Sequence, residues 1–487
     1  MQHINGQWVA AGSHRFGSIN PATGQEIWQG FAAGAGEVAV AVAAARAAFP
    51  AWAARPVEER IAIIEKFKAL VEASKEELAI TIARETGKAL WDARSEVAAV
   101  TAKLTYAREA YAERTGVKAR TTPIGEAIVR HRPHGVMAVY GPYNFPAHLP
   151  NGHIIPALIA GNTVVFKPSE QVPMGGEWMV RKWAEAGLPA GVLNLVQGER
   201  ETGIALAAAA VDGILFTGSS ATGKALHAQL AGRPEVMLAL EMGGNNPLIV
   251  FDVADIGAAV HETLLSAFTG TGQRCTCARR LIVPEWAGAE EFIARLIASA
   301  SALQIGAYDE TPEPFMGPLI SMREAERLLA AQTTLESMGG KVLLRMQRLR
   351  EGLPFVSPAI IDMTSVDNVP DVEYFGPMLQ LYRVKGLEEA VARANATSFG
   401  LSAAVICDSQ AQFQEVSSKL RAGLVNWNRQ TTGASGAGPF GGIGISGNHR
   451  PAGYYSADYC AYPVASVEVK ALTLPAQLAP GLRIEGA

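Results

Sequence analysis

A regular alternation of short apolar runs and helical stretches between residues 162 and 250 constrains the fold most. The strand-like runs NTVVFKPS, GVLNLVQG and VDGILFTG are separated by GGEWMVRKWAEAG and RETGIALAAAA, which have the length of helices. This alternation indicates βαβ units and a parallel sheet, whose ligands lie at the carboxyl ends of the strands. The informative loops are therefore those that follow VVF, LV and ILF.

The rest of the chain is less regular. A second alternating segment, from about residue 246 to 445, contains PLIVF, RRLIVP, PAIID and AAVICD and predicts another α/β domain. The first 115 or so residues are interpreted mainly as packing helices that carry no visible chemistry. GEAIVRHRP resembles a hairpin, VMAVY a buried strand, and the C-terminal YCAYPVASVEVKALTLP a strand with no core of its own to join.

Length, charge and cysteine content narrow the class of protein. A chain of 487 residues is expected to form two or three domains. The net charge of -4 is small and the 42 basic residues are scattered, so neither nucleic acid nor a membrane surface is expected as a partner. The N-terminus lacks a signal-peptide pattern, and the 4 cysteines are too few for a disulfide scaffold. We therefore expect a cytoplasmic protein.

The stretch ILFTGSSATGKA follows a predicted strand and opens a helix, so backbone N–H groups between Gly218 and Gly223 can meet a phosphate. It has P-loop spacing, but Ala225 stands where that motif needs a hydroxyl for magnesium. It also lacks the fingerprint G-x-G-x-x-G, because Ser220 replaces the second glycine. The stretch therefore favours a dinucleotide over a nucleoside triphosphate as ligand. The loop that binds it would differ in geometry from the G-x-G-x-x-G loop.

A second candidate for cofactor binding is FKPSE, which lies just beyond a strand end. Glu170 could accept hydrogen bonds from ribose hydroxyls and would repel a 2′-phosphate, while Lys167 could donate to the same sugar. The alternative is a solvated Lys and Glu in a loop, and this stretch alone does not decide between them.

The stretch FTGTGQRCTCARR places Cys275 and Cys277 just after a Gly-rich turn. A metal site is not expected, because the other two cysteines lack a Cys or His at knuckle spacing. A buried, inert pair stays open as an alternative. Because Arg274, Arg279 and Arg280 are adjacent, we expect cationic neighbours to lower the thiol pKa from about 8.5 and to favour a nucleophilic thiolate.

Two further polar residues could assist such a nucleophile. Asn144, in GPYNFP after the run VMAVY, could donate to a developing alkoxide. Glu241, in LALEMGGNNP, ends an apolar run, where desolvation raises a carboxyl pKa toward that of a general base. Each could instead be structural, as a turn former and a strand-end residue.

The motifs PYNFP, FKPSE, FTGSSATG, LEMGGNNP, GQRC, EYFGP and GPFGG occur in this order. In the residues and the order of these seven motifs, the chain resembles the NAD(P)-dependent aldehyde dehydrogenase superfamily. The resemblance implies that Cys275 is the nucleophile and Glu241 the general base, and that Asn144 and the backbone N–H of Cys275 form an oxyanion hole. Tyr143 stands where the family commonly has Trp, a change that an aromatic wall should tolerate.

The resemblance also implies NAD as cofactor, with the preference over NADP resting on Glu170. Lys167 and Glu170 would hold the adenosine ribose, Ser219 would meet the pyrophosphate, and Glu373 and Phe375 would position the nicotinamide ribose and ring. The full expected cofactor set is Lys167, Ser169, Glu170, Gly198, Gly218, Ser219, Gly223, Glu373 and Phe375. No metal is expected.

The implied architecture has three parts: a Rossmann-like cofactor domain (1–119 and 137–243), an α/β catalytic domain (244–445), and a bridging β-sheet (120–136 and 446–487). In such proteins the bridging strands pair across a subunit interface, so a homodimer or homotetramer is expected. The implied reaction is thiolate attack on an aldehyde, hydride transfer to nicotinamide, and hydrolysis of the thioester.

The tail VNWNRQTTGASGAGPFGGIGISGNHRPAGYYSADYCAYPVAS resembles most closely that of members that oxidise N-succinylglutamate 5-semialdehyde in bacterial arginine catabolism. That substrate carries two carboxylates, for which Ser435, Arg429, Arg274 and the amides of neighbouring glycines are candidate donors. The glycines could instead serve only to turn the loop.

Another acidic semialdehyde, such as that of glutamate or succinate, is the alternative substrate. A CoA-acylating enzyme or a non-catalytic binding protein is less favoured, because both Glu241 and Cys275 are present.

Overall fold

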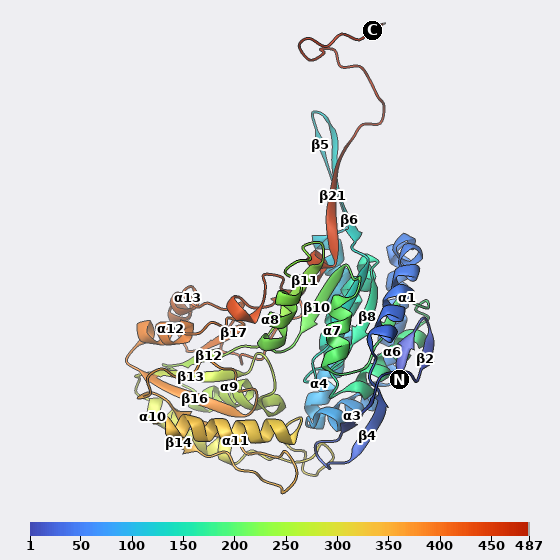
Figure 1. The fold of residues 1–487 in the computed structure, drawn as a ribbon. Helices are drawn as coiled ribbons and strands as arrows, with labels where there is room; N and C mark the ends of the chain where they lie inside the picture. Colours follow the sequence, from blue (N-terminus) through green and yellow to red (C-terminus); the bar gives the residue numbers. More distant parts are fainter. Residues whose placement is uncertain (486–487) are drawn as a thin grey trace.

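Two seven-stranded sheets carry the fold of the computed structural model, which describes residues 1–485 (Figure 1). The first sheet has the order β11-β10-β7-β8-β9-β1-β2. Its parallel part consists of β7 (Val136–Tyr140), β8 (Thr163–Lys167), β9 (Leu193–Leu195), β10 (Gly213–Thr217) and β11 (Met237–Glu241). The first four are buried throughout and β11 from Ala239 onward, as expected of a sheet covered on both faces. The prediction of a Rossmann-like α/β fold is confirmed.

The helices that the alternation predicts are α6 (Pro173–Glu185), α7 (Arg200–Ala208) and α8 (Ser220–Gln229). A further helix, α5 (His148–Ala160), connects β7 to β8 and was not predicted. The N-terminal helices are α1 (Ala35–Ala54), α2 (Val57–Ala73), α3 (Lys75–Thr86) and α4 (Leu90–Arg114). Phe67 of α2 stacks on Trp183 of α6 with ring centroids 3.8 Å apart, which joins the N-terminal helices to α6.

Residues 2–31 differ from the sequence prediction, because they form four strands before the first helix. β1 (Gln2–Ile4) and β2 (Gln7–Val9) extend the first sheet beyond β9 in antiparallel orientation. β3 (Arg15–Ile19) and β4 (Glu26–Phe31) form a separate hairpin. Strands this short are specified by the pairing partner more than by their own pattern, so periodicity did not reveal them.

The second sheet has the order β14-β15-β16-β13-β12-β17-β18. Its strands are β12 (Asn246–Val250), β13 (Ala278–Pro284), β14 (Lys341–Leu344), β15 (Ala359–Asp362), β16 (Met378–Val384), β17 (Ser402–Ile406) and β18 (Leu424–Trp427). The accompanying helices are α9 (Ile256–Phe268), α10 (Ala289–Ser301), α11 (Met322–Ser337), α12 (Leu387–Asn395) and α13 (Gln410–Ser417). The predicted runs PLIVF, RRLIVP, PAIID and AAVICD coincide with β12, β13, β15 and β17.

A three-stranded arm projects from the body of the molecule (Figure 1). It consists of β5 (Val117–Thr122), β6 (Gly125–Pro133) and β21 (Ala461–Glu468). The sequence predicted a C-terminal strand with no core of its own to join. This strand, β21, pairs with β6 along its whole length, from Ala461 opposite Pro133 to Glu468 opposite Glu126. The last two residues of the expected bridging segment, 486 and 487, lie outside the described residues.

Within residues 1–485, α1 alone has the length and composition of a helix that could cross a membrane. It carries Glu37 and Arg46, and it packs against β8 and β9 of the first sheet. Its buried side chains are those of Val38, Ala41, Val42, Ala45 and Trp52.

Candidate active site

Cys275 follows a left-handed turn between α9 and β13. Gly270, Thr271 and Gly272 all have positive φ, of 63°, 57° and 66°. A Cβ atom on Gly272 would lie 2.2 Å from the carbonyl oxygen of Gly376, so the turn requires glycine there. The turn places Cys275 at the surface of the second sheet, where it is half-buried.

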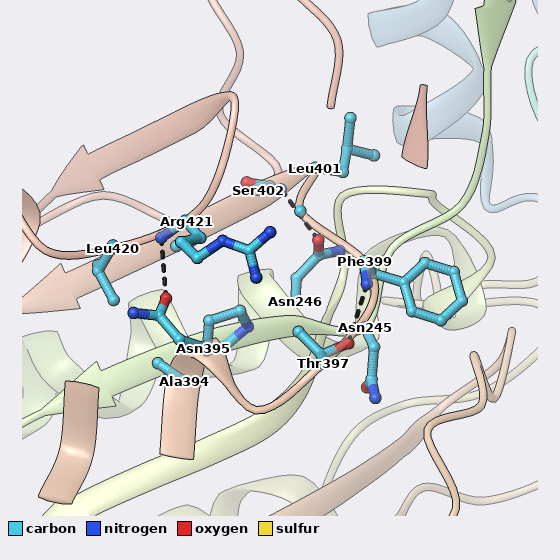
Figure 2. A pocket seen from close by; sticks show the side chains of 13 residues that line it. Asn245, Asn246, Ala394, Asn395, Thr397, Phe399, Leu401, Ser402, Leu420 and Arg421 are labelled. Atoms are coloured by element: carbon cyan, nitrogen blue, oxygen red, sulfur yellow. Dashed lines mark hydrogen bonds between the residues drawn. The ribbon is translucent and has the colours of Figure 1, made fainter. Parts of the chain in front are cut away.

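Asn246, at the start of β12, fixes this cysteine loop in place. Its Nδ2 donates to the carbonyl oxygens of Cys275 and Cys277, at 2.7 and 2.9 Å. Its Oδ1 accepts from the backbone N–H of Ser402 at 3.0 Å, so one amide joins the loop to β17 (Figure 2). The pocket drawn around it has a volume of about 10 Å³, which is room for about one water and not for a substrate.

The expected lowering of the Cys275 pKa by neighbouring arginines is wrong. Burial raises the pKa of this thiol to about 12, and the carboxyls of Glu373 and Glu241 add to the effect. Arg279 acts in the opposite direction but does not outweigh burial. Thiolate formation therefore needs a proton acceptor in the site.

The arginines are held by other groups. Arg279 donates to the carbonyl oxygens of Gly272, Gly376 and Arg274, and thereby braces the cysteine turn. Arg280 donates to the carbonyl oxygens of Asn245, Arg393 and Ala394. Arg274 forms a buried ion pair with Asp92 of α4. Their guanidinium groups are used in backbone and ion-pair contacts, which position the loop.

The second cysteine has a different environment. Cys277 is fully buried, and its Sγ donates to the carbonyl oxygen of Thr269 at 3.6 Å. Burial raises its pKa as well. The two neighbours thus differ in exposure, because Cys275 lies in the turn before β13, whereas Cys277 is packed beneath that turn against the carbonyl oxygen of Thr269.

Asn144 lies beside the cysteine loop. Its Nδ2 donates to the carbonyl oxygen of Gln273 at 2.9 Å, and its side chain is buried. The loop that carries it is held by Glu96 of α4, which accepts from the backbone N–H groups of Ala147 and His148 at 2.9 and 3.1 Å. Glu96 is itself paired with Lys88 at 2.7 Å. The structure thus brings Asn144 and Cys275 together across two sheets.

Helix α4 is therefore part of the site, and its interpretation as a packing helix without chemistry is wrong. Asp92 holds the cysteine loop, Glu96 holds the Asn144 loop, and Lys103 lines the adjacent cavity. These residues recur at steps of four and seven, which places them on one face of a helix. That spacing is a signal in the sequence, but alternating charges along a helix usually indicate a solvated face.

Glu241 ends β11, with its side chain buried. Its Oε2 has no hydrogen-bond partner within residues 1–485. Burial raises its pKa well above the ordinary value of 4.5, against the opposing effects of the Ala452 backbone and of Lys103. A carboxyl of raised pKa without a fixed partner suits proton transfer near neutral pH.

A cavity of about 250 Å³ opens beside Glu241. Its wall is formed by α4, by α5, by the strand ends of β10 and β11, and by the loop around residue 435. The polar or titratable side chains on it are those of Lys103, Tyr106, His148, His153, Thr217, Glu241 and Ser435. This volume can take a small organic molecule.

The three candidate substrate residues lie in different places. Ser435 lines the cavity, and its Oγ accepts from the backbone N–H of Ala437 at 3.3 Å. Arg429 has a side chain 69% exposed, 4.0 Å from Glu262, and is not among the residues that line the cavity. Arg274 does not line it either, since it pairs with Asp92.

Candidate cofactor residues gather at the carboxyl ends of β8, β9 and β10. Ser219 caps α8, and its Oγ accepts from the backbone N–H of Thr222 at 3.2 Å. Gly218 precedes this cap, and a Cβ atom on Gly223 would lie 2.3 Å from Sδ of Met242. Gly198 follows β9 with a φ of 151°.

Lys167 ends β8 and is buried, and its Nζ donates to the carbonyl oxygen of Pro168 at 3.1 Å. An ammonium group has three N–H donors, so donors remain for a ligand. Glu170 is half-buried, and its carboxylate accepts from Oγ of Ser169 at 3.4 Å. These residues and the α8 N-terminus form a polar edge that suits a sugar and a pyrophosphate.

Glu373 and Phe375 lie between this edge and the cysteine loop. Glu373 accepts from the backbone N–H of Gly244 at 3.1 Å and lies 3.9 Å from Arg279. Burial raises its pKa. Phe375 meets Tyr143 edge to face with ring centroids 6.0 Å apart, so Tyr143 does supply an aromatic wall. No group of three His, Cys, Asp or Glu side chains suited to a metal ion occurs in residues 1–485.

Residues 8–463 match the sequence profile of the aldehyde dehydrogenase family. The chain belongs to the aldehyde dehydrogenase family. The resemblance drawn from the seven motifs is thereby confirmed.

Relatives of this aldehyde dehydrogenase match it from end to end. Proteins named N-succinylglutamate 5-semialdehyde dehydrogenase from Hahella chejuensis and Paraburkholderia xenovorans are each 55% identical to it, over 99% of this chain and 98% and 99% of theirs. A putative aldehyde dehydrogenase from Burkholderia cenocepacia has a similar structure, with a TM-score of 0.91, 32% identity, and coverage of 98% of this chain and 99% of its own. PnpE in complex with nicotinamide adenine dinucleotide matches with a TM-score of 0.91 and 33% identity, over 97% of this chain and 98% of its own.

Proposed function

We propose that this chain catalyses the NAD-dependent oxidation of N-succinyl-L-glutamate 5-semialdehyde to N-succinyl-L-glutamate, a step of arginine catabolism. The observation that carries the proposal is the cavity shared by Glu241, Ser435 and Lys103. His148, which follows the Asn144 loop, also lines it, and the Glu241 carboxyl acts on the Cys275 thiol. The relatives that share 55% of its residues over their whole length support the same substrate.

In the proposed mechanism, the thiolate of Cys275 attacks the aldehyde carbon. Asn144 Nδ2 and the backbone N–H of Cys275 donate to the oxygen as it becomes negative. Attack gives a thiohemiacetal on Cys275, which becomes a thioester once its hydride has left to an acceptor, and bound NAD would supply that acceptor. Glu241 then accepts a proton from the water that attacks the thioester, and the Cys275 thiolate is the leaving group. Because the thiol pKa is raised, a carboxylate of raised pKa in the same site is a suitable acceptor for its proton too.

Bound NAD would supply the hydride acceptor. The residues present fit it, since the buried ammonium group of Lys167 has N–H donors to spare and the carboxylate of Glu170 is free to accept from a ribose. Ser169, Gly198, Gly218, Ser219 and Gly223 would border the phosphates and sugar. Glu373 and Phe375 would orient the nicotinamide side.

We further propose the domain division 1–119 with 137–243, 244–445, and 120–136 with 446–487. The two sheets and the arm support this division, although β5 already begins at Val117. Exposed apolar side chains on the arm, such as those of Val117 and Val467, support a homodimer or homotetramer. We place the enzyme in the cytoplasm, where four free thiols stay reduced.

The test is NADH formation, followed by absorbance, with N-succinylglutamate semialdehyde against the semialdehydes of succinate and glutamate and a simple aliphatic aldehyde. We expect the succinylated aldehyde to have the highest kcat/KM. Cys275→Ala should be inactive, whereas the matched variant Cys277→Ala should keep its turnover. A higher kcat/KM for another acidic semialdehyde would replace the substrate, and an active Cys275→Ala would refute the mechanism.

A further inference from the structure

Lys103 is the charged group of the cavity for which the proposed mechanism gives no role. It extends from α4 into the cavity beside Glu241 and is half-buried there. Within residues 1–485 it makes no hydrogen bond and has no carboxylate within 4.0 Å, whereas Lys88 is paired with Glu96 and Lys167 donates to a backbone carbonyl oxygen. Partial burial disfavours the charged ammonium group, and an anion bound beside it would offset that cost.

The opposite wall of the cavity leaves space for this side chain. Gly152 lies on α5, where a helical glycine costs about 1 kcal/mol relative to alanine. A Cβ atom built on Gly152 would lie 3.6 Å from both Cε and Nζ of Lys103, so the ammonium group rests directly against α5. A larger residue at 152 would fill the space in front of Lys103 and exclude an anion from it.

The other basic groups on the cavity wall are uncharged histidines. Burial lowers the pKa of His148 well below its ordinary value and that of His153 to about 3. His153 is also engaged with Tyr459 and Thr217, at 2.9 and 3.0 Å. Lys103 is therefore the cation that an anionic substrate would meet in this part of the described chain.

We infer that Lys103 is a specificity-determining residue whose ammonium group binds a carboxylate of the aldehyde substrate. This inference rests on the proposed function for the choice of substrate. Lys103 of α4 thus replaces Arg429 and Arg274 as the proposed cation for the substrate carboxylate. The guanidinium groups of those two arginines are not part of the cavity wall. Ser435 stays on the wall as a second donor.

The test compares two aldehydes that differ only in a carboxylate, 5-oxopentanoate and pentanal, together with N-succinylglutamate semialdehyde. Lys103→Met should raise KM for the acidic aldehydes about 10- to 100-fold, the range for a lost charge-assisted hydrogen bond, with kcat little changed. For pentanal, kcat and KM should stay within about twofold of the wild type. Arg108→Met removes an exposed charge from the same helix and is the matched control, with no change expected for any substrate.

A pH series gives an independent readout. Burial lowers the pKa of Lys103 to about 8, against the opposing charge of Glu241. The groups that face it are Glu241 from β11, His148 and His153 from α5, and Tyr106 from α4 itself. Titration of Glu241 or Cys275 affects both aldehydes alike, so the ratio of kcat/KM for 5-oxopentanoate to that for pentanal should fall above about pH 8 in the wild type and stay flat in Lys103→Met.

The outcomes separate this inference from the proposed function. An equal loss for pentanal would overturn the inference, because Lys103 would then act through Glu241 or the fold. An unchanged KM for every acidic aldehyde would overturn it too, even with the succinylated aldehyde as the best substrate. The wild type could fail to oxidise the succinylated aldehyde while Lys103→Met still raises KM for 5-oxopentanoate. In that case the proposed substrate is wrong, but the binding of a carboxylate by Lys103 is supported.

Discussion

Glu241 has an environment that couples burial to chemistry. Its carboxyl is desolvated at the end of a buried strand, and one oxygen has no hydrogen-bond partner in residues 1–485. Such a group destabilises the folded chain when it is charged, because the folded state holds the proton more tightly than the unfolded state does. The stability deficit grows as pH rises from the unfolded pKa to the raised folded pKa. A destabilised carboxylate is also a stronger base, which is the property that thioester hydrolysis needs.

Removal of this base should separate the two halves of the reaction. In Glu241→Gln, we expect a burst of NADH of about one equivalent per site followed by slow steady-state turnover, because the thioester forms but is hydrolysed slowly. In the wild type, steady-state turnover should fall as pH drops through a pKa above 4.5, since the protonated carboxyl cannot accept a proton. Stopped-flow absorbance across pH measures both. Because Glu241 is also the proposed acceptor of the thiol proton, the burst should be slower than in the wild type but should reach the same amplitude. A burst amplitude that falls together with steady-state turnover would contradict the role of base in hydrolysis.

The proposed role of Asn144 as an oxyanion donor can be tested by its removal. Asn144→Ala should lower kcat some hundreds-fold, the typical loss for one oxyanion donor, and should leave the Kd for NAD nearly unchanged. Steady-state kinetics and quenching of protein fluorescence by the cofactor provide the two measurements. A loss of NAD binding of similar size would show instead that the Asn144–Gln273 hydrogen bond serves to hold the loop.

At the scale of elements, the site depends on how α4 spans the two sheets. One face of this helix holds the cysteine loop through Asp92 and the Asn144 loop through Glu96, and it presents Lys103 to the cavity. The strands supply the other half, because the parallel strands β7, β8, β10 and β11 end at one edge of the first sheet. Reactive and cofactor-binding groups then lie in the loops of that edge.

The loop after β8 should set cofactor choice. Replacement of Glu170 by Ala removes a carboxylate that would repel a 2′-phosphate, so we expect a higher kcat/KM with NADP and a lower one with NAD. Glu185→Ala, which removes an exposed carboxylate at the end of α6, is the control and should change neither. An unchanged ratio of NADP to NAD use in Glu170→Ala would show that this carboxylate does not contact the ribose.

At the scale of the whole molecule, the arm is the part with the least core of its own. Its strands pair with one another, and Val117, Ile124 and Val467 are exposed on it. A projecting sheet with exposed apolar side chains and free strand edges is a surface for association. The ion pair between Arg130 and Glu468 joins β6 to β21 without covering these side chains.

Charge on the arm should therefore weaken assembly. We expect the double variant Val117→Lys/Val467→Lys to shift the protein to smaller species in sedimentation velocity, with the circular dichroism of the folded chain retained. Ile204→Lys is the control, because Ile204 is an exposed apolar residue on α7, away from the arm. An unchanged sedimentation coefficient in the double variant, or a wild type that is monomeric, would contradict assembly through the arm.

The sequence by itself determined the parallel α/β class, the runs that became β8, β9, β10, β12 and β13, and the motif residues Cys275, Glu241 and Asn144. These depend on local periodicity and on the residue types that a reaction needs, and both are visible along the chain. The short strands β1 and β2 escaped because pairing with β9 specifies them.

Only the tertiary structure decided which charged side chains of the site are already paired and which reach the cavity. Three arginines beside Cys275 predicted a lowered thiol pKa, but burial raises it and the guanidinium groups bind carbonyls and Asp92. Arg274 meets Asp92 across 182 positions of sequence, so no local pattern could show that it is already paired. Lys103 lies in a region that the sequence indicated only as packing helices without chemistry, yet it is the cation that reaches the cavity. Burial and ion pairing are properties of residues brought together from distant parts of the chain, and they decide which charge remains free to bind a substrate.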